Sequence, residues 1–470
     1  MENNKLSRKN FLKGVGALMG ATATAGVAGK AEAAPQPVRT DEKGLTVRKR
    51  KYKYPWWVKT VDKITTQVNP AIEERPGLHY SAYYGNMMHH DEWKLETDKA
   101  KAHVKEGLVN NIPGRTLPDV ALHYATHAYM TYGSLGSFDA PRSVGTKAHD
   151  ELLSYNMHPP QDFDLPAWQA TAEEASRVVE AAGVQLGASM VGFTQLNPQW
   201  LYTWTHRDPK ATEMKMVPGK GMVIPEKDVY VIAMISQGPR DLLIRNQSEL
   251  GAAGYRAAYS RIFSAAVGMV RFIRGLGYSA NQMNGTGAVI PHSISAGLGE
   301  LGRMNRMINP IFGGNVRIEC ILTDLPLAFD KPIDFGLQEF CRHCKKCATE
   351  CPAGALSLAD APYWVPANGY QAPGKKTYFE NNDACASYFG ERGNYCSTCM
   401  SVCPWSKQDF AALHEMTKVF AAKTPKAGTL FTELDDAFGY GLIKPESEEA
   451  AEWWDLDIPE LGIDSYQGKR

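Results

Sequence analysis

Apolar positions in the middle of the chain recur with the periods of strands and helices. Residues 229–235 are apolar throughout, which predicts a strand covered on both faces and therefore central in its sheet. Residues 254–275 place apolar and aromatic side chains three or four positions apart, which predicts a long helix. The other predicted elements are helices at 98–108, 118–131, 170–182 and 293–298 and strands at 188–193 and 315–324.

Glycines and one cysteine add detail to this predicted α/β core. Gly183 is expected to end the helix at 170–182, and Gly277 lies in the turn after the long helix. Met283–Gly287 is a glycine-rich turn whose backbone amides could approach a phosphate or another ligand closely. That pattern alone does not identify a ligand. Cys320 lies within an apolar strand and is expected to be a core residue.

Length and composition indicate a soluble protein of several packed units. The chain has 470 residues, 44% hydrophobic and 22% charged. Its 51 basic and 51 acidic residues balance, which argues against a nucleic-acid-binding surface. The pattern divides the chain into a leader (1–33), an irregular unit rich in Pro, Gly, His and Tyr (34–165), the α/β core (166–330), a cysteine-rich domain (331–412) and a C-terminal segment packing back on the core (413–470).

The first 33 residues have the organisation of an export signal. A charged stretch, Ser7–Lys13, precedes a small-residue apolar run, Gly14–Gly29, and a cleavage-site pattern, Ala31–Ala33. The charged stretch resembles the twin-arginine (Tat) signal, with Lys9 where the second arginine usually stands. Tat carries folded proteins and suits cofactors inserted before export, whereas a general secretory signal is the alternative. The apolar run is too short to span a membrane.

Eight of the nine cysteines form two motifs between residues 341 and 404. Each motif ends in Cys-Pro, and their spacing suits two [4Fe–4S] clusters, in which the Cys-Pro cysteine of one motif ligates the other cluster. Structural zinc does not need a Cys-Pro at the end of each motif, and disulfides do not favour such tight spacing. We assign Cys341, Cys344, Cys347 and Cys403 to cluster 1 and Cys351, Cys385, Cys396 and Cys399 to cluster 2.

His89–Glu92 is a second group of metal-ligand residue types. Because adjacent histidines point apart on a regular element, a solvated surface or local hydrogen-bonding site is favoured over a metal site.

Several further stretches, together with the leader and both cysteine motifs, resemble the corrinoid-dependent reductive dehalogenases of organohalide-respiring bacteria. The spacing Cys385-x10-Cys396 also matches, since an ordinary bacterial ferredoxin has two residues in this gap. The resemblance covers most of residues 255–441. The matching stretches are Phe272–Tyr278, Ala296–Arg303, Asn315–Arg317, Thr323–Ala328, Lys331–Gly336, Glu339–Cys341 and Phe438–Gly441.

The resemblance implies an α+β fold, in which a nitroreductase-like α/β cobalamin-binding core is joined to a bacterial-ferredoxin-like domain with two [4Fe–4S] clusters. It also implies a base-off corrinoid with no protein ligand below the cobalt. None of the twelve histidines is followed at the third place by glycine, so the D-x-H-x-x-G cobalamin motif is absent. The implied activity replaces a halogen of an organohalide by hydrogen, with electrons passing through the clusters to Co(I).

Tyr259 matches the family's proton donor, and Asn284 and Arg317 match its supporting asparagine and arginine. A phenol is a weak acid, so a neighbouring guanidinium would stabilise the tyrosinate that remains after proton transfer. From periodicity alone, Tyr259 would be a core aromatic and Arg317 a structural ion-pair partner. Phe389 and Tyr395 resemble residues that wall the family's substrate cavity, although they could instead shield the clusters.

The resemblance also implies partners and a location. It implies a small organohalide substrate, a small integral membrane anchor protein, an electron donor from the respiratory chain and a peripheral position on the outer face of the cytoplasmic membrane. A homodimer is consistent with the family. Two other functions stay open: an epoxyqueuosine-reductase-like corrinoid enzyme and a non-catalytic electron-transfer subunit.

Overall fold

The computed structural model describes residues 39–40, 46–48, 54–77, 98–120, 122, 158–212, 214–217, 219–283, 285–367, 371–392, 395–407, 412–437 and 441–458. Several predictions therefore lie outside the described residues: the leader at 1–33, the His89–Glu92 group, Asn284, most of the helix at 118–131 and most of Phe438–Gly441.

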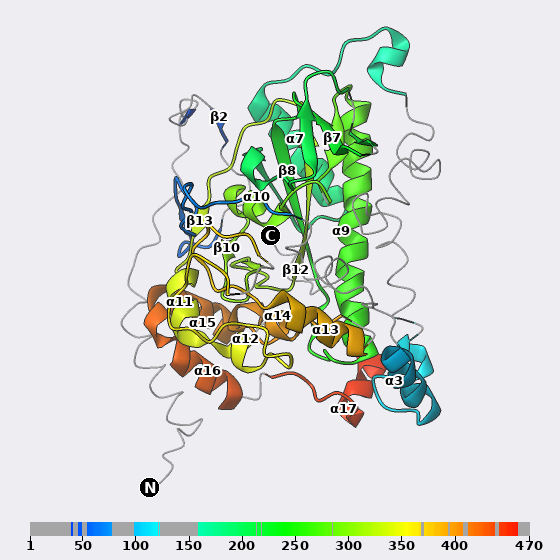
Figure 1. Cartoon of the computed structure of the whole chain (residues 1–470), viewed down its shortest axis with the longest axis vertical. Helices are drawn as coiled ribbons and strands as arrows, with labels where there is room; N and C mark the ends of the chain where they lie inside the picture. Colours follow the sequence, from blue (N-terminus) through cyan, green and yellow to red (C-terminus); the bar gives the residue numbers. More distant parts are fainter. Residues whose placement is uncertain are drawn as a thin grey trace. The chain divides into compact units, whose positions relative to one another are not determined.

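A four-stranded antiparallel sheet forms the centre of the core (Figure 1). The strand order is β4-β8-β12-β9, so β8 is an interior strand, as its apolar sequence predicted. The neighbours β8 and β12 pair over their full lengths, from Val316 opposite Gln237 to Thr323 opposite Tyr230. The bounds are β4 (Met190–Gln195), β8 (Tyr230–Gln237), β9 (Ala280–Gln282) and β12 (Val316–Thr323).

The alternation of side chains along β8 separates two hydrophobic cores. Ile232 and Met234 face one core, whereas Val231, Ala233 and Ile235 face the other. All five side chains are fully buried, because both faces of the sheet are covered by helices. Cys320 of β12 also has no exposed surface and is a core residue, as predicted.

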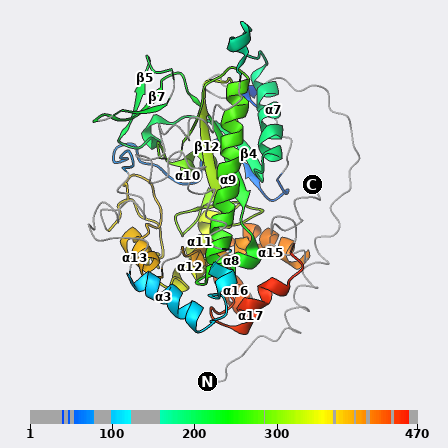
Figure 2. The same ribbon diagram turned by 90° about the vertical axis from the view of Figure 1, so that its right-hand side faces the viewer.

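Two helices cover one face of the sheet and a third covers the other. On the first face lie α7 (Ala172–Gln185) and α9 (Glu249–Gly275), and Figure 2 shows α9 along the length of the sheet. On the second face lies α10 (Val289–Ser295). The first core contains side chains of α7 and α9, and the second contains side chains of α10 and the segment that follows it.

Three predicted helix boundaries were wrong. Helix α7 continues past Gly183, where a Cβ would lie 2.7 Å from Val191 Cγ2, so this glycine allows close packing and does not end the helix. Helix α9 begins at Glu249, five residues before the predicted start, because the Ser248 hydroxyl accepts a hydrogen bond from the Gly251 amide. Helix α10 ends at Ser295, so it overlaps the predicted helix at 293–298 only in its last residues.

The cysteine-rich region is a group of short helices at one end of β12 and α9 (Figure 1). Phe340 and Trp405 are buried at its centre, in a core that also contains cluster cysteines. Its elements are α11 (Leu337–Cys344), α12 (Lys346–Thr349), α13 (Asn382–Arg392), α14 (Thr398–Ser401), η4 (Pro404–Ser406), α15 (Ala412–Lys423), η5 (Pro425–Ala427) and α16 (Gly428–Ala437).

Segments distant in sequence join this region to the rest of the chain. Strand β3 (Lys59–Thr60) pairs antiparallel with β13 (Ile333–Asp334), which precedes the first cysteine motif. Arg48 is buried and forms ion pairs with Glu180 at 2.6 Å and Asp330 at 2.9 Å. The predicted domain boundaries stay a prediction.

The remaining elements are short, apart from one helix of twelve residues, which confirms the helix predicted at 98–108. No described helix is both long and apolar enough to cross a membrane. These elements are β1 (Arg39–Thr40), β2 (Thr46–Val47), α3 (Asp98–Val109), η2 (Pro160–Phe163), η3 (Pro198–Trp200), β5 (Thr205–Asp208), β6 (Lys215–Val217), β7 (Gly221–Pro225), α8 (Arg240–Leu243), β10 (Glu300–Leu301), β11 (Met307–Ile308), α17 (Glu448–Ala451) and η6 (Glu452–Asp455).

Candidate iron–sulfur and catalytic site

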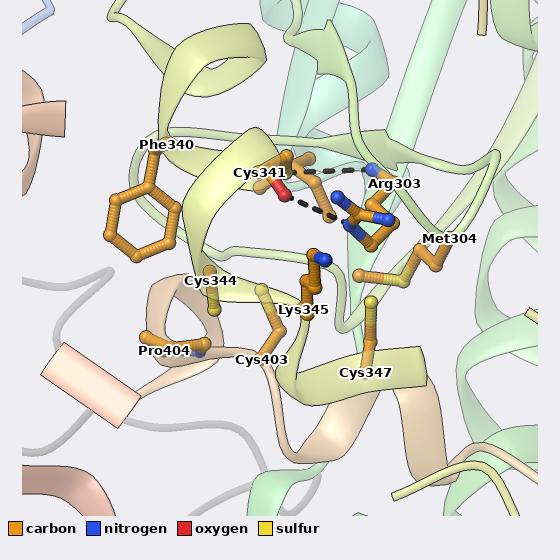
Figure 3. A pocket seen from close by; sticks show the side chains of 10 residues that line it. Arg303, Met304, Phe340, Cys341, Cys344, Lys345, Cys347, Cys403 and Pro404 are labelled. Carbon is orange, nitrogen blue, oxygen red and sulfur yellow. Dashed lines mark hydrogen bonds between the residues drawn. The ribbon is translucent and has the colours of Figure 1, made fainter. Parts of the chain in front are cut away.

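The four cysteines assigned to cluster 1 line one pocket (Figure 3). Cys341 and Cys344 come from α11, Cys347 comes from α12, and Cys403 immediately precedes η4. Pro404 occupies the first turn of η4, so this Cys-Pro pair starts a short 3-10 helix. The structure therefore brings together three thiols of the first motif and one thiol of the second.

The four cysteines assigned to cluster 2 are also neighbours. The Cys399 thiol lies within electrostatic reach of Cys351 and Cys396, and the Cys385 thiol within reach of Cys396 and Cys399. Between the two groups, Cys347 lies within electrostatic reach of Cys399. The eight thiols thus form two groups of four, which approach each other at Cys347 and Cys399. Their assignment as ligands stays a prediction.

The burial of these thiols suits iron–sulfur ligation. Burial raises the pKa of Cys341 and of Cys399 to about 12, and it raises the pKa of Cys347 well above the ordinary value. A thiolate here needs a cation to offset burial, and the iron of a cluster supplies that charge. Among the described residues, no three His, Cys, Asp or Glu side chains are placed to hold a single metal ion.

Arg303 fixes the backbone around cluster 1. Its side chain is 1% exposed, and its guanidinium donates hydrogen bonds to the carbonyls of Cys341 (2.9 Å), Ser357 (2.7 Å) and Ala359 (2.9 Å). Its backbone amide lies 3.4 Å from Cys341 Sγ and donates to it (Figure 3). Arg303 therefore holds two loops together and places positive charge beside this thiol.

Buried ion pairs surround the rest of the cysteine region. Asp435 of α16 pairs with Lys346 and, at 3.5 Å, with Lys407, and all three side chains are almost completely buried. Arg306 forms a bidentate pair with Glu380, with distances of 2.5 and 3.0 Å, close to the thiols of cluster 2.

Two tyrosines of α9 and one arginine of β12 form the second part of the site. Tyr255 and Tyr259 are one helical turn apart, with ring centroids separated by 5.2 Å. The guanidinium carbon of Arg317 lies 3.9 Å from the Tyr255 ring centroid and 5.0 Å from that of Tyr259. The structure thus places Arg317 beside the predicted proton donor, as the resemblance implied. Asn284 cannot be compared, because it lies outside the described residues.

The predicted pocket residues, Phe389 and Tyr395, lie beside the two tyrosines of α9. Tyr395 stacks on Tyr255 with a centroid distance of 5.0 Å and an interplanar angle of 5°. Phe389 meets Tyr395 edge to face at 5.5 Å. Since Tyr395 immediately precedes Cys396, a continuous row of aromatic rings connects a cluster 2 ligand position with Tyr259.

Sequence reasoning treated Tyr255 only as an apolar helix position. Burial, with Tyr259 as the next contribution, raises the pKa of Tyr255 well above its ordinary value, although Arg317 opposes this shift. Tyr255 therefore stays protonated at neutral pH. The signal that could have identified it is its spacing of four residues from Tyr259, which places both phenols on one face of a helix.

Unsatisfied polar atoms at the start of β12 fit a polar ligand. Asn315 is 1% exposed, and neither atom of its side-chain amide has a hydrogen-bond partner among the described residues. Arg317 donates to the Val316 carbonyl but has Nε and Nη2 unsatisfied in the same part of the chain. Buried polar atoms need partners. The amide-bearing rim of a corrinoid offers suitable donors and acceptors, so these residues fit that cofactor.

Comparison with known proteins finds similar families for two stretches of the chain. Residues 53–220 match the family described as "Reductive dehalogenase subunit", and residues 340–406 match the "4Fe-4S double cluster binding domain". The chain is similar to reductive dehalogenases. This similarity supports two [4Fe–4S] clusters and a corrinoid as the cofactors, and it confirms the predicted resemblance and fold class.

The similarity to individual proteins covers different shares of each chain. It is 31% identical to a tetrachloroethene reductive dehalogenase of Sulfurospirillum multivorans, over 62% of this chain and 61% of the relative. It is 25% identical to a chloroethene reductive dehalogenase of Dehalococcoides mccartyi, over 98% of both chains. A solved reductive dehalogenase structure aligns with a TM-score of 0.59 and 23% identity, over 85% of this chain and 51% of that one. The chain thus spans less than two thirds of the length of the first and third of these proteins.

Proposed function

We propose that this protein is a corrinoid-dependent reductive dehalogenase that replaces a halogen of an organohalide by hydrogen. One observation carries the proposal: Arg317 lies against Tyr255 and Tyr259 at the end of an aromatic row that begins beside Cys396. A proton source is thus close to an electron source, and reductive removal of a halide needs both.

The residues of this chain have separable roles in that reaction. Tyr259 donates the proton from its hydroxyl, and the Arg317 guanidinium stabilises the tyrosinate that remains. Asn315 and Arg317 have polar atoms without partners in the described part of the chain, and these atoms would hold the corrinoid, which supplies the strong reductant when bound. Tyr395 and Phe389 exclude water from this end of the site.

The arrangement of thiols supports an order for electron transfer. Cys396, which would hold cluster 2, directly follows Tyr395, while Cys347, which would hold cluster 1, lies within electrostatic reach of Cys399. We therefore expect electrons to enter at cluster 1, pass to cluster 2 and continue to the corrinoid. A respiratory-chain donor supplies them.

Two relatives named for chloroethenes support small chlorinated alkenes as the first substrates to test. Chlorinated alkanes and chloroaromatics remain in the proposed substrate class. Stacked aromatic walls favour flat, unsaturated molecules over bulky saturated ones.

The test is anaerobic oxidation of reduced methyl viologen by the purified protein loaded with both clusters and corrinoid. The oxidation should depend on an added organohalide and release one halide for each halogen replaced, across a panel of chlorinated ethenes, ethanes and phenols. Turnover of epoxyqueuosine-containing tRNA instead would assign the alternative enzyme, and a protein that binds no corrinoid would favour an electron-transfer subunit.

The proposed cellular location of the protein is based on the export-signal pattern of residues 1–33. Ser7–Lys13 supports Tat-dependent export of the folded, loaded protein to the outer face of the cytoplasmic membrane. There we propose peripheral attachment through a small integral anchor protein, with a homodimer as the assembly. Replacing Arg8 and Lys9 by glutamines should leave the protein in the cytoplasm, as fractionation would show.

A further inference from the structure

The segment that precedes α9 lies against the second cysteine motif. Asn246 is fully buried in this segment, 150 positions before Cys396 in the sequence. The following residue, Gln247, has a positive φ of 70°, and Ser248 caps α9. The Asn246 side chain contacts Cys396, Ser397 and Thr398.

The contacts of Asn246 fix the orientation of its amide. Its Oδ1 accepts hydrogen bonds from the Ser397 backbone amide at 2.8 Å and from the Ser397 hydroxyl at 3.1 Å. A backbone N–H can only donate, so the oxygen of the Asn246 amide must face Ser397. The Nδ2 group therefore points the other way, toward Cys396 Sγ at 3.5 Å and the Thr398 hydroxyl.

Thr398 provides a second hydrogen bond to the Cys396 sulfur. Its Oγ1 accepts from Asn246 Nδ2 and lies 3.2 Å from Cys396 Sγ. Because a ligated thiolate can only accept, the Thr398 hydroxyl proton points at the sulfur. Asn246 polarises that hydroxyl and strengthens its donation. The sulfur of Cys396, which is half-buried, thus receives two hydrogen bonds from the buried side chains of Asn246 and Thr398.

The geometry points to Asn246 and Thr398 as the residues that set the reduction potential of cluster 2. Hydrogen bonds to a cluster sulfur withdraw electron density and stabilise the more negative, reduced cluster, so they raise its potential. Both residues are positioning residues, since they act through Cys396. The inference depends on the presence of the cluster and holds whichever molecule the enzyme reduces.

Cluster 1 offers a matched control within the same chain. The Thr432 hydroxyl lies 3.5 Å from Cys344 Sγ, and it is also shared with the carbonyls of Cys344 (3.2 Å) and Gly428 (3.1 Å). Thr432→Val and Thr398→Val therefore remove the same group from two different clusters. A general effect of losing a buried hydroxyl would be common to both variants, whereas a local effect would not.

The experiment is a redox titration of the full-length protein with both clusters, followed by electron paramagnetic resonance. The signal of cluster 2 is assigned as the one that Cys396→Ser removes. Thr398→Val should lower the midpoint potential of cluster 2 and leave that of cluster 1 unchanged, and Thr398→Ser should restore the native value. Asn246→Ala should also lower the potential of cluster 2, and Thr432→Val should not change it.

A second measurement detects the hydrogen bond itself. Electron–nuclear double resonance of reduced cluster 2 should show an exchangeable proton that disappears in deuterated buffer and in Thr398→Val. If the Thr398→Val protein fails to assemble cluster 2, the same titration is made with Thr398→Ala, which also removes the hydroxyl and has a smaller side chain. A native potential for cluster 2 in an assembled Thr398→Val or Thr398→Ala protein would overturn the inference, and so would equal shifts of both clusters.

Discussion

The Arg317 guanidinium carbon is 3.9 Å from the ring centroid of Tyr255 and 5.0 Å from that of Tyr259. One cation therefore acts on two phenols that also interact through a side-chain hydrogen bond. A cation over an aromatic face stabilises a developing negative charge on the ring oxygen as well as the neutral ring. The two tyrosines and the arginine are best treated as one unit when variants are interpreted.

Tyr259→Phe should abolish most of the proposed activity. It removes the proton donor while keeping the ring that stacks on Phe263 at 5.5 Å. Loss of a general acid costs about 10² to 10⁴ in rate. The measurement is organohalide-dependent oxidation of methyl viologen with halide release, and full turnover in this variant would assign the proton to another group.

Tyr255→Phe is the matched comparison. It keeps the stack with Tyr395 and the contact with Arg317 and removes only the hydroxyl that interacts with Tyr259. We expect a rate loss of about tenfold or less, as for a hydrogen bond that positions the donor. A loss as large as that of Tyr259→Phe would show that the two phenols share the acid role.

Arg317→Lys should lower the rate although it keeps the charge. A lysine ammonium is a compact, strongly hydrated charge and cannot stack over two rings as the planar guanidinium does. We expect a loss of about one to two orders of magnitude in rate at saturating substrate, which corresponds to ~1–3 kcal/mol of transition-state stabilisation. Unchanged kinetics would contradict the proposed stabilisation of the tyrosinate.

Cys403→Ser should remove or open cluster 1 and leave cluster 2 in place. Cys403 is one of four thiols around a single pocket, and a serine oxygen is a harder, poorer ligand for a cluster iron. Iron analysis should approach the content of one [4Fe–4S] cluster. Cys320→Ala is the control and should leave both clusters intact. Cys320 is a buried residue of β12 and lies in the hydrophobic core between the central sheet and α10, which contains no cluster cysteine.

Local patterns predicted much of the chain. The continuous apolar runs of β8 and β12 depend on residues a few positions apart, so the sequence could predict the central strand and the burial of Cys320. The two cysteine motifs could be recognised for the same reason, because their cysteines lie close together in the sequence. Their spacing does not show that Cys347 approaches Cys399.

Contacts between distant segments could not be predicted. The early start of α9 depends on a cap at Ser248, which follows a turn with positive φ that the sequence does not announce. The role of Asn246 depends on a partner 150 positions away. Tyr255 looked like an ordinary apolar position, because the helix pattern does not reveal that Arg317 and Tyr395 cover its ring.

His292 provides a test of the fold outside the cofactor sites. It is fully buried in α10, its Nδ1 donates to the Ala288 carbonyl at 2.7 Å, and its Nε2 accepts from the Asn197 amide at 3.3 Å. Burial lowers the pKa of His292 from its usual 6.5 to about 4. The folded protein thus holds a neutral imidazole, which the unfolded chain protonates near pH 6.5.

The stabilising contribution of the neutral imidazole is therefore complete above pH 6.5 and is lost as pH falls toward 4. At pH 5 the loss amounts to about 2 kcal/mol. His292→Gln should destabilise the protein at pH 7.5, because one of the two hydrogen bonds is lost. Thermal unfolding followed by circular dichroism should show the gap between wild type and variant narrowing at pH 5. A constant gap at both pH values would mean that His292 does not titrate differently in the folded and unfolded chains.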